Sequence, residues 1–246
     1  MNAALTWTEI KLLTREPLTL VVSLLFPTVL MLLLLASFGS EPSEEFAGLG
    51  GTDFYVPSYL GAAIAVMGFI GIPTHLASYR QEGVLRRFRA GGVPATSIMV
   101  AQTVMMAVLS LVGAAVMIGI AYSGFEISAP VSVAGAVAGF VVGVLAFAGL
   151  GLFLGSLMPS ARAAQGLGLL FFFGTFFLVG GGPPPALLPD ALNTAVEFTP
   201  IGQLADAIRS PWTGQGHDVT ALVALGAIAL VTAILAHRRL SRLDLG

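Results

Sequence analysis

The stretch SYRQEGVLRRFRAGG, residues 78–92, is the most charged part of a chain that carries few charges elsewhere. Of the 246 residues, 56% are hydrophobic and only 10% are charged, whereas soluble domains carry roughly 25% charged residues. A surface with so little charge cannot face mainly water. The chain is therefore expected to be an integral membrane protein, with this basic stretch between two apolar runs.

Six apolar segments are long enough to cross a bilayer, because about 20 helical residues span a hydrocarbon core of roughly 30 Å. None of them contains Asp, Glu, Lys or Arg. The segments are residues 18–38, 54–77, 95–122, 131–157, 163–182 and 219–236. The first is too long for a typical signal-peptide core and is interpreted as a retained span. The predicted fold is an all-α membrane protein, with residues 1–246 forming a single transmembrane domain.

The distribution of Lys and Arg predicts the orientation, because basic residues concentrate in cytoplasmic loops. With the N-terminus inside, the inner segments hold ten of the eleven basic residues. The outer segments hold nine of the thirteen acidic residues and only one basic residue, Arg209. Both termini and residues 78–92 are therefore expected on the cytoplasmic side. The inner segments are residues 1–17, 78–94, 158–162 and 237–246.

Further short helices are predicted outside the spans. Residues 2–16 form an amphipathic pattern with Trp7 at a position suited to the headgroup level, which predicts an interfacial helix. Residues 186–198 and 200–210 are too short to cross the bilayer and predict paired half-helices at the outer leaflet, before the last span. The second of these has one apolar face at helical spacing. That face consists of Ile201, Leu204 and Ile208.

The fourth span carries Gly135, Gly139 and Gly143 at four-residue intervals. Small residues at this spacing form a flat ridge against which another helix can pack closely. Packing within the chain is the expected use, and a contact between subunits is the alternative.

Residues 78–92 also have a helical pattern, in which Val84, Leu85 and Phe88 form an apolar stripe among charged positions. Gly91-Gly92 and then Pro94 predict the end of this helix. One interpretation is a loop whose arginines fix the topology and bind anionic lipid. The other is a helix lying flat at the membrane surface that presents a face to a cytoplasmic partner.

Several kinds of chemistry are absent from the sequence. The predicted spans contain no ionisable residue except His75, which disfavours a carrier driven by an ion gradient. We expect His75 to be a hydrogen-bonded residue near the inner interface. No Gly-Lys-Ser/Thr sequence is available for a phosphate-binding loop, and the chain has no Cys. No catalytic residues, metal site or cofactor of its own are expected, so the chain is not predicted to be an enzyme.

Two local sequences resemble motifs of a known family, the type-two ABC transporter permeases. EGVLRRFRAGGVP resembles the coupling-helix segment of these permeases and retains Glu82, Gly83 and Leu85, although the family often has Thr where Val84 stands. The sequence LP…TPIGQLADAIR resembles the signature before the last span, through Pro189, Pro200 and Arg209. Together with the span layout, the resemblance covers almost the whole chain and is greatest for the daunorubicin-exporter-like multidrug branch.

The resemblance implies a permease subunit in a bacterial inner membrane, paired with a second copy or a paralogue. A cytoplasmic ATP-binding subunit would bind ATP and Mg²⁺ and dock on the segment of residues 82–89. It implies export of a hydrophobic or amphiphilic, drug-like substrate, and no nucleic-acid partner. Export of a lipid or glycan, an autonomous channel or carrier, and a sensing subunit are alternatives. The docking segment consists of Glu82, Gly83, Val84, Leu85, Arg86, Arg87, Phe88 and Arg89.

Overall fold

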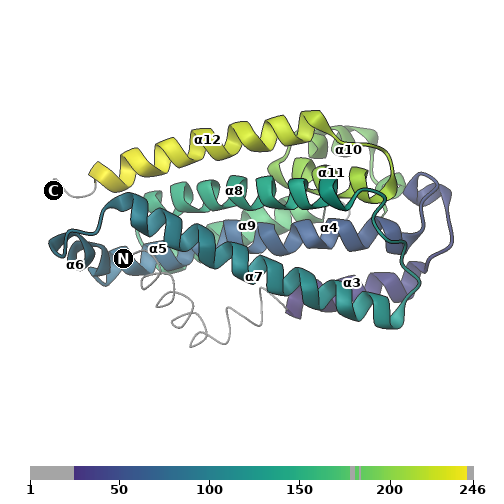
Figure 1. The fold of residues 1–246 in the computed structure, drawn as a ribbon, viewed down its shortest axis with the longest axis horizontal. Coiled ribbons are helices and arrows are strands. Elements are labelled where there is room, and N and C mark those ends of the chain that lie inside the picture. Colours follow the sequence, from purple (N-terminus) through teal and green to yellow (C-terminus); the bar gives the residue numbers. More distant parts are fainter. Residues whose placement is uncertain (1–24, 178–180, 183, 243–246) are drawn as a thin grey trace.

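The computed structural model describes residues 25–177, 181–182 and 184–242 as a bundle of helices that run along one long axis (Figure 1). No strand occurs in these residues, so the prediction of an all-α fold is confirmed for them. The helices that cover the predicted spans are α3 (Phe26–Phe38), α4 (Gly51–Val66), α5 (Ile72–Gln81), α7 (Ala95–Gly124), α8 (Val133–Leu157), α9 (Ala161–Phe176) and α12 (Val219–Arg242). The other helical elements are α6 (Val84–Ala90), α10 (Asp190–Glu197), α11 (Pro200–Thr213), the π-helical turn η3 (Met67–Gly71), and the 3-10 turns η2 (Glu44–Phe46) and η4 (Pro185–Leu187).

Four of the predicted spans appear as helices long and apolar enough to cross a membrane. They are Gly51–Gln81, Ala95–Gly124, Val133–Leu157 and Val219–Arg242. The part of the first predicted span that the structure describes forms α3, with 13 residues, and the fifth forms α9, with 16 residues. The six-span arrangement stays a prediction for these two, and the predicted interfacial helix 2–16 lies outside the described residues.

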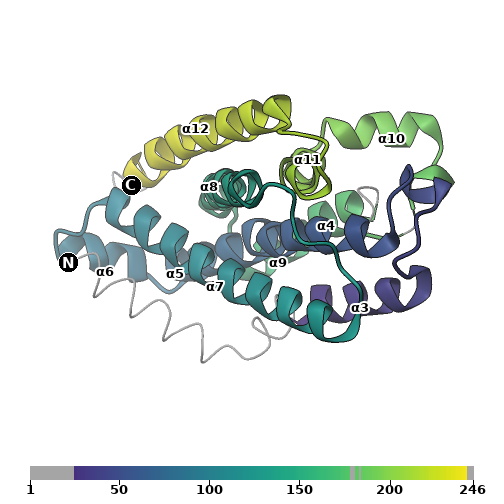
Figure 2. The same ribbon diagram turned by 45° about the vertical axis from the view of Figure 1, so that its right-hand side comes forward.

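α8 packs against α12, α11, α5, α7 and α4 (Figure 2), while the helix Gly51–Gln81 is the most buried of the four long apolar helices. The glycines of α8 allow these close approaches, since a Cβ at Gly139 would lie 2.2 Å from the carbonyl oxygen of Ala207 in α11. A Cβ at Gly143 would lie 2.2 Å from the Leu204 side chain. The glycine ridge therefore packs within the chain, as expected.

The helix from Gly51 to Gln81 is continuous but contains the π-helical turn η3. Pro73 follows this turn and has no N–H to donate to the carbonyl of Phe69, four residues earlier. A π turn accommodates such a missing hydrogen bond with one additional residue. The turn lies in the middle of the bundle, where its side chains are buried.

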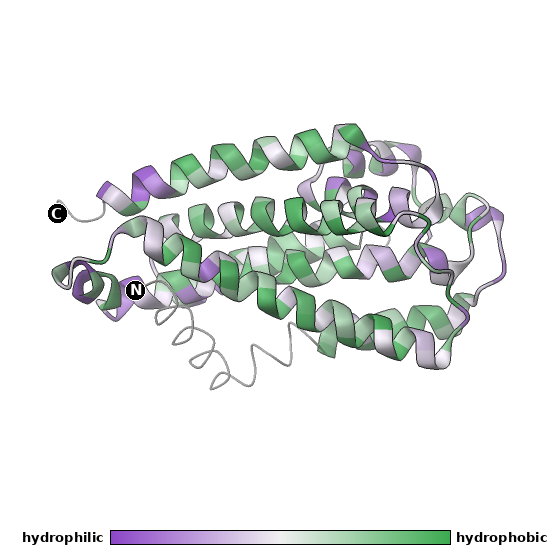
Figure 3. Cartoon of the chain, viewed as in Figure 1, coloured by the Kyte–Doolittle hydropathy of each residue, from purple (hydrophilic) through white to green (hydrophobic). Residues whose placement is uncertain are grey.

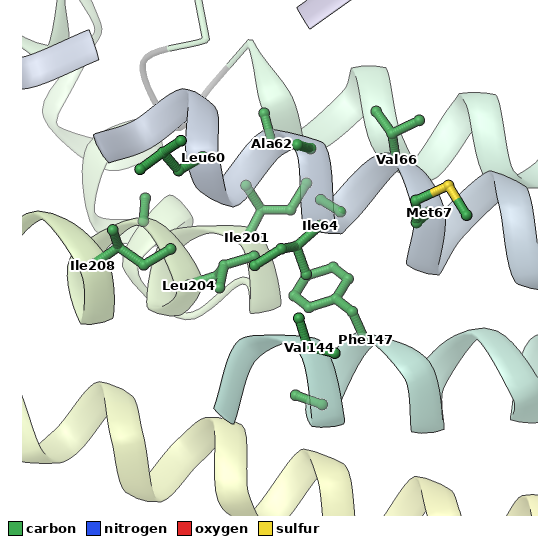
Figure 4. Packing of buried hydrophobic residues seen from close by; sticks show 14 of the residues in the cluster. Leu60, Ala62, Ile64, Val66, Met67, Val144, Phe147, Ile201, Leu204 and Ile208 are labelled. Atoms are coloured by element: carbon green, nitrogen blue, oxygen red, sulfur yellow. The ribbon is translucent and has the colours of Figure 1, made fainter. Parts of the chain in front are cut away.

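Apolar side chains of α4, α8 and α11 form the part of the core shown in Figure 4. Leu60 and Ile64 of α4 and Val144 and Phe147 of α8 surround the buried face of α11. Polar residues collect at the two ends of the bundle, and the long helices between them are mainly hydrophobic (Figure 3). α6 and the end of α12 lie at one end, and the segments that join α3 to α4 and α7 to α8 lie at the other.

Candidate functional site

The basic stretch forms a short helix, α6, between two glycine-containing turns. Gly83 precedes α6 in the left-handed backbone region, with φ of +72°, which glycine adopts at little cost. After the helix, Gly92 has φ of +75° and its N–H donates to the carbonyl of Arg89 at 2.7 Å. The N–H of Val93 donates to the carbonyl of Phe88 at 2.9 Å. Both ends of α6 are therefore fixed by backbone geometry.

The apolar stripe of α6 faces its own chain. Leu85 and Phe88 are half-buried and pack against the hydrophobic core. The ring of Phe88 meets the ring of Tyr79 edge-on, with centroids 6.0 Å apart. No residue of α6 is fully buried, and Arg86 and Arg87 are exposed. The stripe thus anchors α6 to the bundle and leaves a charged outer face.

Two arginines of the basic stretch bind the ends of other helices. Arg89 donates to the carbonyl of Leu240 in α12 at 3.2 Å. Arg80, on α5, donates to the carbonyls of Ser156 and Met158 at the end of α8, both at 3.4 Å. The last carbonyls of a helix lack intrahelical partners and carry a partial negative charge, so a guanidinium stabilises them. These contacts connect α5 and α6 to α8 and α12.

Glu82 lies in the turn before α6, and its carboxylate accepts a hydrogen bond from the hydroxyl of Ser78 at 3.0 Å. Val84 is half-buried at the first position of the helix. The candidate segment 82–89 therefore combines a glycine turn at its start, an inward apolar face and an outward basic face.

At the opposite end of the bundle, the predicted signature residues lie at helix starts and on a helix face. Pro189 precedes the first residue of α10, and Pro200 is the first residue of α11. The Thr199 hydroxyl accepts from the N–H of Gly202 at 3.1 Å and caps α11. The predicted apolar face of α11 is buried against α4 and α8, and it consists of Ile201, Leu204 and Ile208.

Arg209 of α11 connects this helix to α4. Its guanidinium lies 4.5 Å from the centroid of the Phe54 ring and donates to the Ser58 hydroxyl at 3.4 Å. It also forms an ion pair with Asp206, one turn earlier. Burial raises the pKa of the Asp206 carboxyl above its ordinary value, and the Arg209 charge counteracts part of this shift.

His75 is hydrogen-bonded, as the sequence predicted. Its Nδ1 lies 3.0 Å from Nε2 of Gln102 in α7, and its ring is 4.4 Å from the Tyr79 ring. It is a buried, hydrogen-bonded residue that joins α5 to α7, next to the anchor of α6.

The family model for ABC-2 type transporters matches residues 2–211, a range that includes α6, α10 and most of α11. The chain belongs to the ABC-2 type transporter family. It is accordingly the membrane-spanning permease of an ABC transporter and a transport subunit, and this family implies a separate ATP-binding partner. A search of curated proteins returned no match.

Several contacts between helices in this permease could not be predicted from the sequence. The sequence does not distinguish Arg80 and Arg89 from the other arginines, but their partners are carbonyl groups more than seventy residues away in the chain. The contact between Arg209 and α4 was also not predicted. The one signal in the sequence was the position of these arginines, which lie just before or within a predicted short helix.

Proposed function

We propose that this permease exports a hydrophobic or amphiphilic substrate, with α6 as the coupling helix for a cytoplasmic ATP-binding subunit. The attachment of α6 is the observation that carries the proposal. Leu85 and Phe88 join it to the core, Arg89 joins it to α12, and Arg86 and Arg87 point their charge away from the bundle. ATP and Mg²⁺ would be held by the partner, and this chain would bind no cofactor of its own.

This attachment would allow a movement of α6 to reach the spanning helices. α6 follows α5 through a single turn, and Arg80 on α5 holds the end of α8. A displacement of a short helix fixed in this way is passed on, whereas a flexible loop would absorb it. The exposed arginines suit an acidic surface on the partner, where such charges mainly set the association rate and the register.

The direction of transport and the membrane are also part of the proposal. The basic end of the bundle would face the cytoplasm of a bacterial cell, in agreement with the positive-inside rule, and both termini would be cytoplasmic. A second copy or a paralogue would complete the pathway. The resemblance to the daunorubicin-exporter-like branch supports export of drug-like compounds.

The test is association with the candidate ATPase, encoded beside this chain or supplied by co-expression. The double variant Arg86→Gln/Arg87→Gln should slow association about threefold to tenfold and weaken its salt dependence, measured by surface plasmon resonance. Arg162→Gln is the matched control, since Arg162 is exposed at the same end of the bundle but outside α6. Equal effects of both changes, or no association with any ATPase, would contradict the role of α6.

A further inference from the structure

His75 and Gln102 form a polar contact inside the helical bundle. His75 lies on α5 and Gln102 on α7, they are 7% and 0% exposed, and a 3.0 Å hydrogen bond joins Nδ1 of His75 to Nε2 of Gln102. Both residues belong to helices long and apolar enough to span a membrane, where polar side chains are costly to bury. Apolar residues would fill this space without that cost, so packing alone does not account for the pair.

Buried aromatic rings connect this pair to α6. The His75 ring lies 4.4 Å from the ring of Tyr79, one turn later on α5. Tyr79 is 6% exposed, and its ring meets the Phe88 ring of α6 edge-on with centroids 6.0 Å apart. The four side chains therefore form a continuous series of contacts from α6 through α5 to α7.

The direct chain link between α6 and α7 is supported less well. It consists of residues 91–94, and a Cβ at Gly91 or Gly92 would meet no atom outside α6 within 4 Å. Because glycine also has the widest backbone freedom, part of a displacement of α6 would be absorbed in this link. The packed route through Tyr79 and His75 is the stiffer of the two.

A hydrogen bond suits such a route because it is directional. Apolar surfaces can slide past one another at little cost, since the hydrophobic effect depends on buried area and not on direction. Separation of His75 from Gln102 would break a hydrogen bond in a medium that offers no water to replace it. α5 and α7 should therefore move together at this contact.

α7 can carry such a movement over a long distance. It is a single helix of 30 residues that contains no proline, and it runs from the end of the bundle that holds α6 to the opposite end (Figure 1). Gln102 lies near its start, so a displacement received there reaches the outer end of the helix.

We propose that His75 and Gln102 are positioning residues that transmit a displacement of α6 to α7, and through α7 to the outer end of the bundle. The inference rests on the proposed function, because it takes α6 as the helix that the ATP-binding subunit moves. Arg80 connects α5 to the end of α8. The contact with α7 is a second connection, which leaves α5 at a different point.

The experiment uses single cysteines labelled with a bimane fluorophore, which the cysteine-free sequence allows. The α6 reporter is Ala90→Cys and the α7 reporter is Ser123→Cys near the outer end of that helix, both at exposed positions. Each labelled permease is assembled with its ATPase in nanodiscs, and the change in fluorescence on addition of ATP and vanadate is measured. Both reporters should respond in the otherwise unchanged permease.

His75→Leu removes the hydrogen bond and should reduce the response of the α7 reporter about fivefold, whereas that of the α6 reporter should change less than about twofold. Gln102→Met, which keeps the length of the side chain, should have the same effect. His75→Asn is the matched control and should retain most of the response, because it places a polar atom close to the position of Nδ1. Ser110→Ala, at a buried position of α7 outside the series of contacts, should change neither reporter. Thermal unfolding checks that each variant is folded.

Three results would overturn the inference: an undiminished α7 response in both His75→Leu and Gln102→Met, an equal loss at both reporters, or a loss in His75→Asn as large as in His75→Leu. The second result would mean that the pair only holds α6 in place, and the third that the hydrogen bond is not what transmits the movement. An α6 reporter that does not respond in the otherwise unchanged permease would reject the coupling role of α6 itself, and this inference with it.

Discussion

α6 and α11 are both short helices with an apolar face, bounded by glycine or proline, but the bundle holds them in different ways. The face of α11 lies between α4 and α8, with Ile201, Leu204 and Ile208 at 3%, 0% and 1% exposure. α6 projects from the end of the bundle and has no fully buried residue (Figure 2). The same kind of sequence pattern therefore produces a core element at one end and an anchored surface element at the other.

The arginines at the two ends of the bundle also differ in how far the fold encloses them. Arg80 and Arg89 bind backbone carbonyls at helix ends and leave neighbouring arginines exposed. Arg209 is enclosed by an aromatic ring, a hydroxyl and a carboxylate on two helices. Changes in α11 should consequently reduce stability, whereas changes in α6 should reduce coupling and leave the fold intact.

The largest effect is expected from Leu204→Ala in α11. Leu204 fills the space above Gly143 of α8 and Gly61 of α4, so its truncation leaves a cavity between three helices. The free energy of unfolding should fall by about 2–5 kcal/mol, measured by denaturation in detergent micelles. Leu192→Ala, at an exposed position of α10, is the control and should change it by less than about 0.5 kcal/mol.

Arg209→Gln should have the next largest effect, a loss of about 1–3 kcal/mol at neutral pH, because it leaves Asp206 partly buried without its cation. Folding raises the pKa of Asp206, so the folded state holds this proton more tightly than the unfolded chain. Stability from this group is present at low pH and is lost as the pH rises from about 4 through the folded pKa. The deficit of Arg209→Gln should therefore shrink as the pH is lowered.

Thermal unfolding of Arg209→Gln at pH 5 and pH 7.5 measures this dependence. Adding Asp206→Asn removes the carboxylate and should remove most of the difference between the two pH values. If Arg209→Gln is as stable as the unchanged permease at pH 7.5, the contacts of Arg209 do not hold α11 against α4.

Phe88→Ala should have the smallest effect on stability, about 1 kcal/mol, because Phe88 is only half-buried. Loss of the contact with Tyr79 removes one of the attachments of α6, while Leu85 and Arg89 still hold the helix, so ATP-dependent transport should still fall at least tenfold. Transport in proteoliposomes and unfolding in micelles are measured on the same preparation. Phe198→Ala, at an 81% exposed position of the outer end, should alter neither.

The sequence predicted those features that depend on local periodicity. The buried face of α11, the packing of the glycine ridge and the short helix within residues 78–92 follow from residues three or four positions apart, which lie on one side of a helix. The carbonyl partners of Arg80 and Arg89 lie 76 and 151 residues away, and no local pattern encodes them.

The candidate site shows the same division. The sequence marked Val84, Leu85 and Phe88 as a stripe, but only the fold reveals that Leu85 and Phe88 pack against their own bundle. Similarly, Arg209 and Phe54 are distant in sequence and come together only because α11 packs against α4. The helices themselves could be predicted from local sequence patterns, whereas the contacts between helices could not.

The π turn from Met67 to Gly71 determines the directions in which the side chains after it point around the helix axis. One additional residue rotates the segment from Ile72 onward by about 100° relative to an uninterrupted α-helix. With that rotation undone, His75 would face away from Gln102, and Arg80 would face away from the end of α8. One additional residue in the middle of the bundle therefore sets the orientation of α5, and with it the contacts of the helix from which α6 continues.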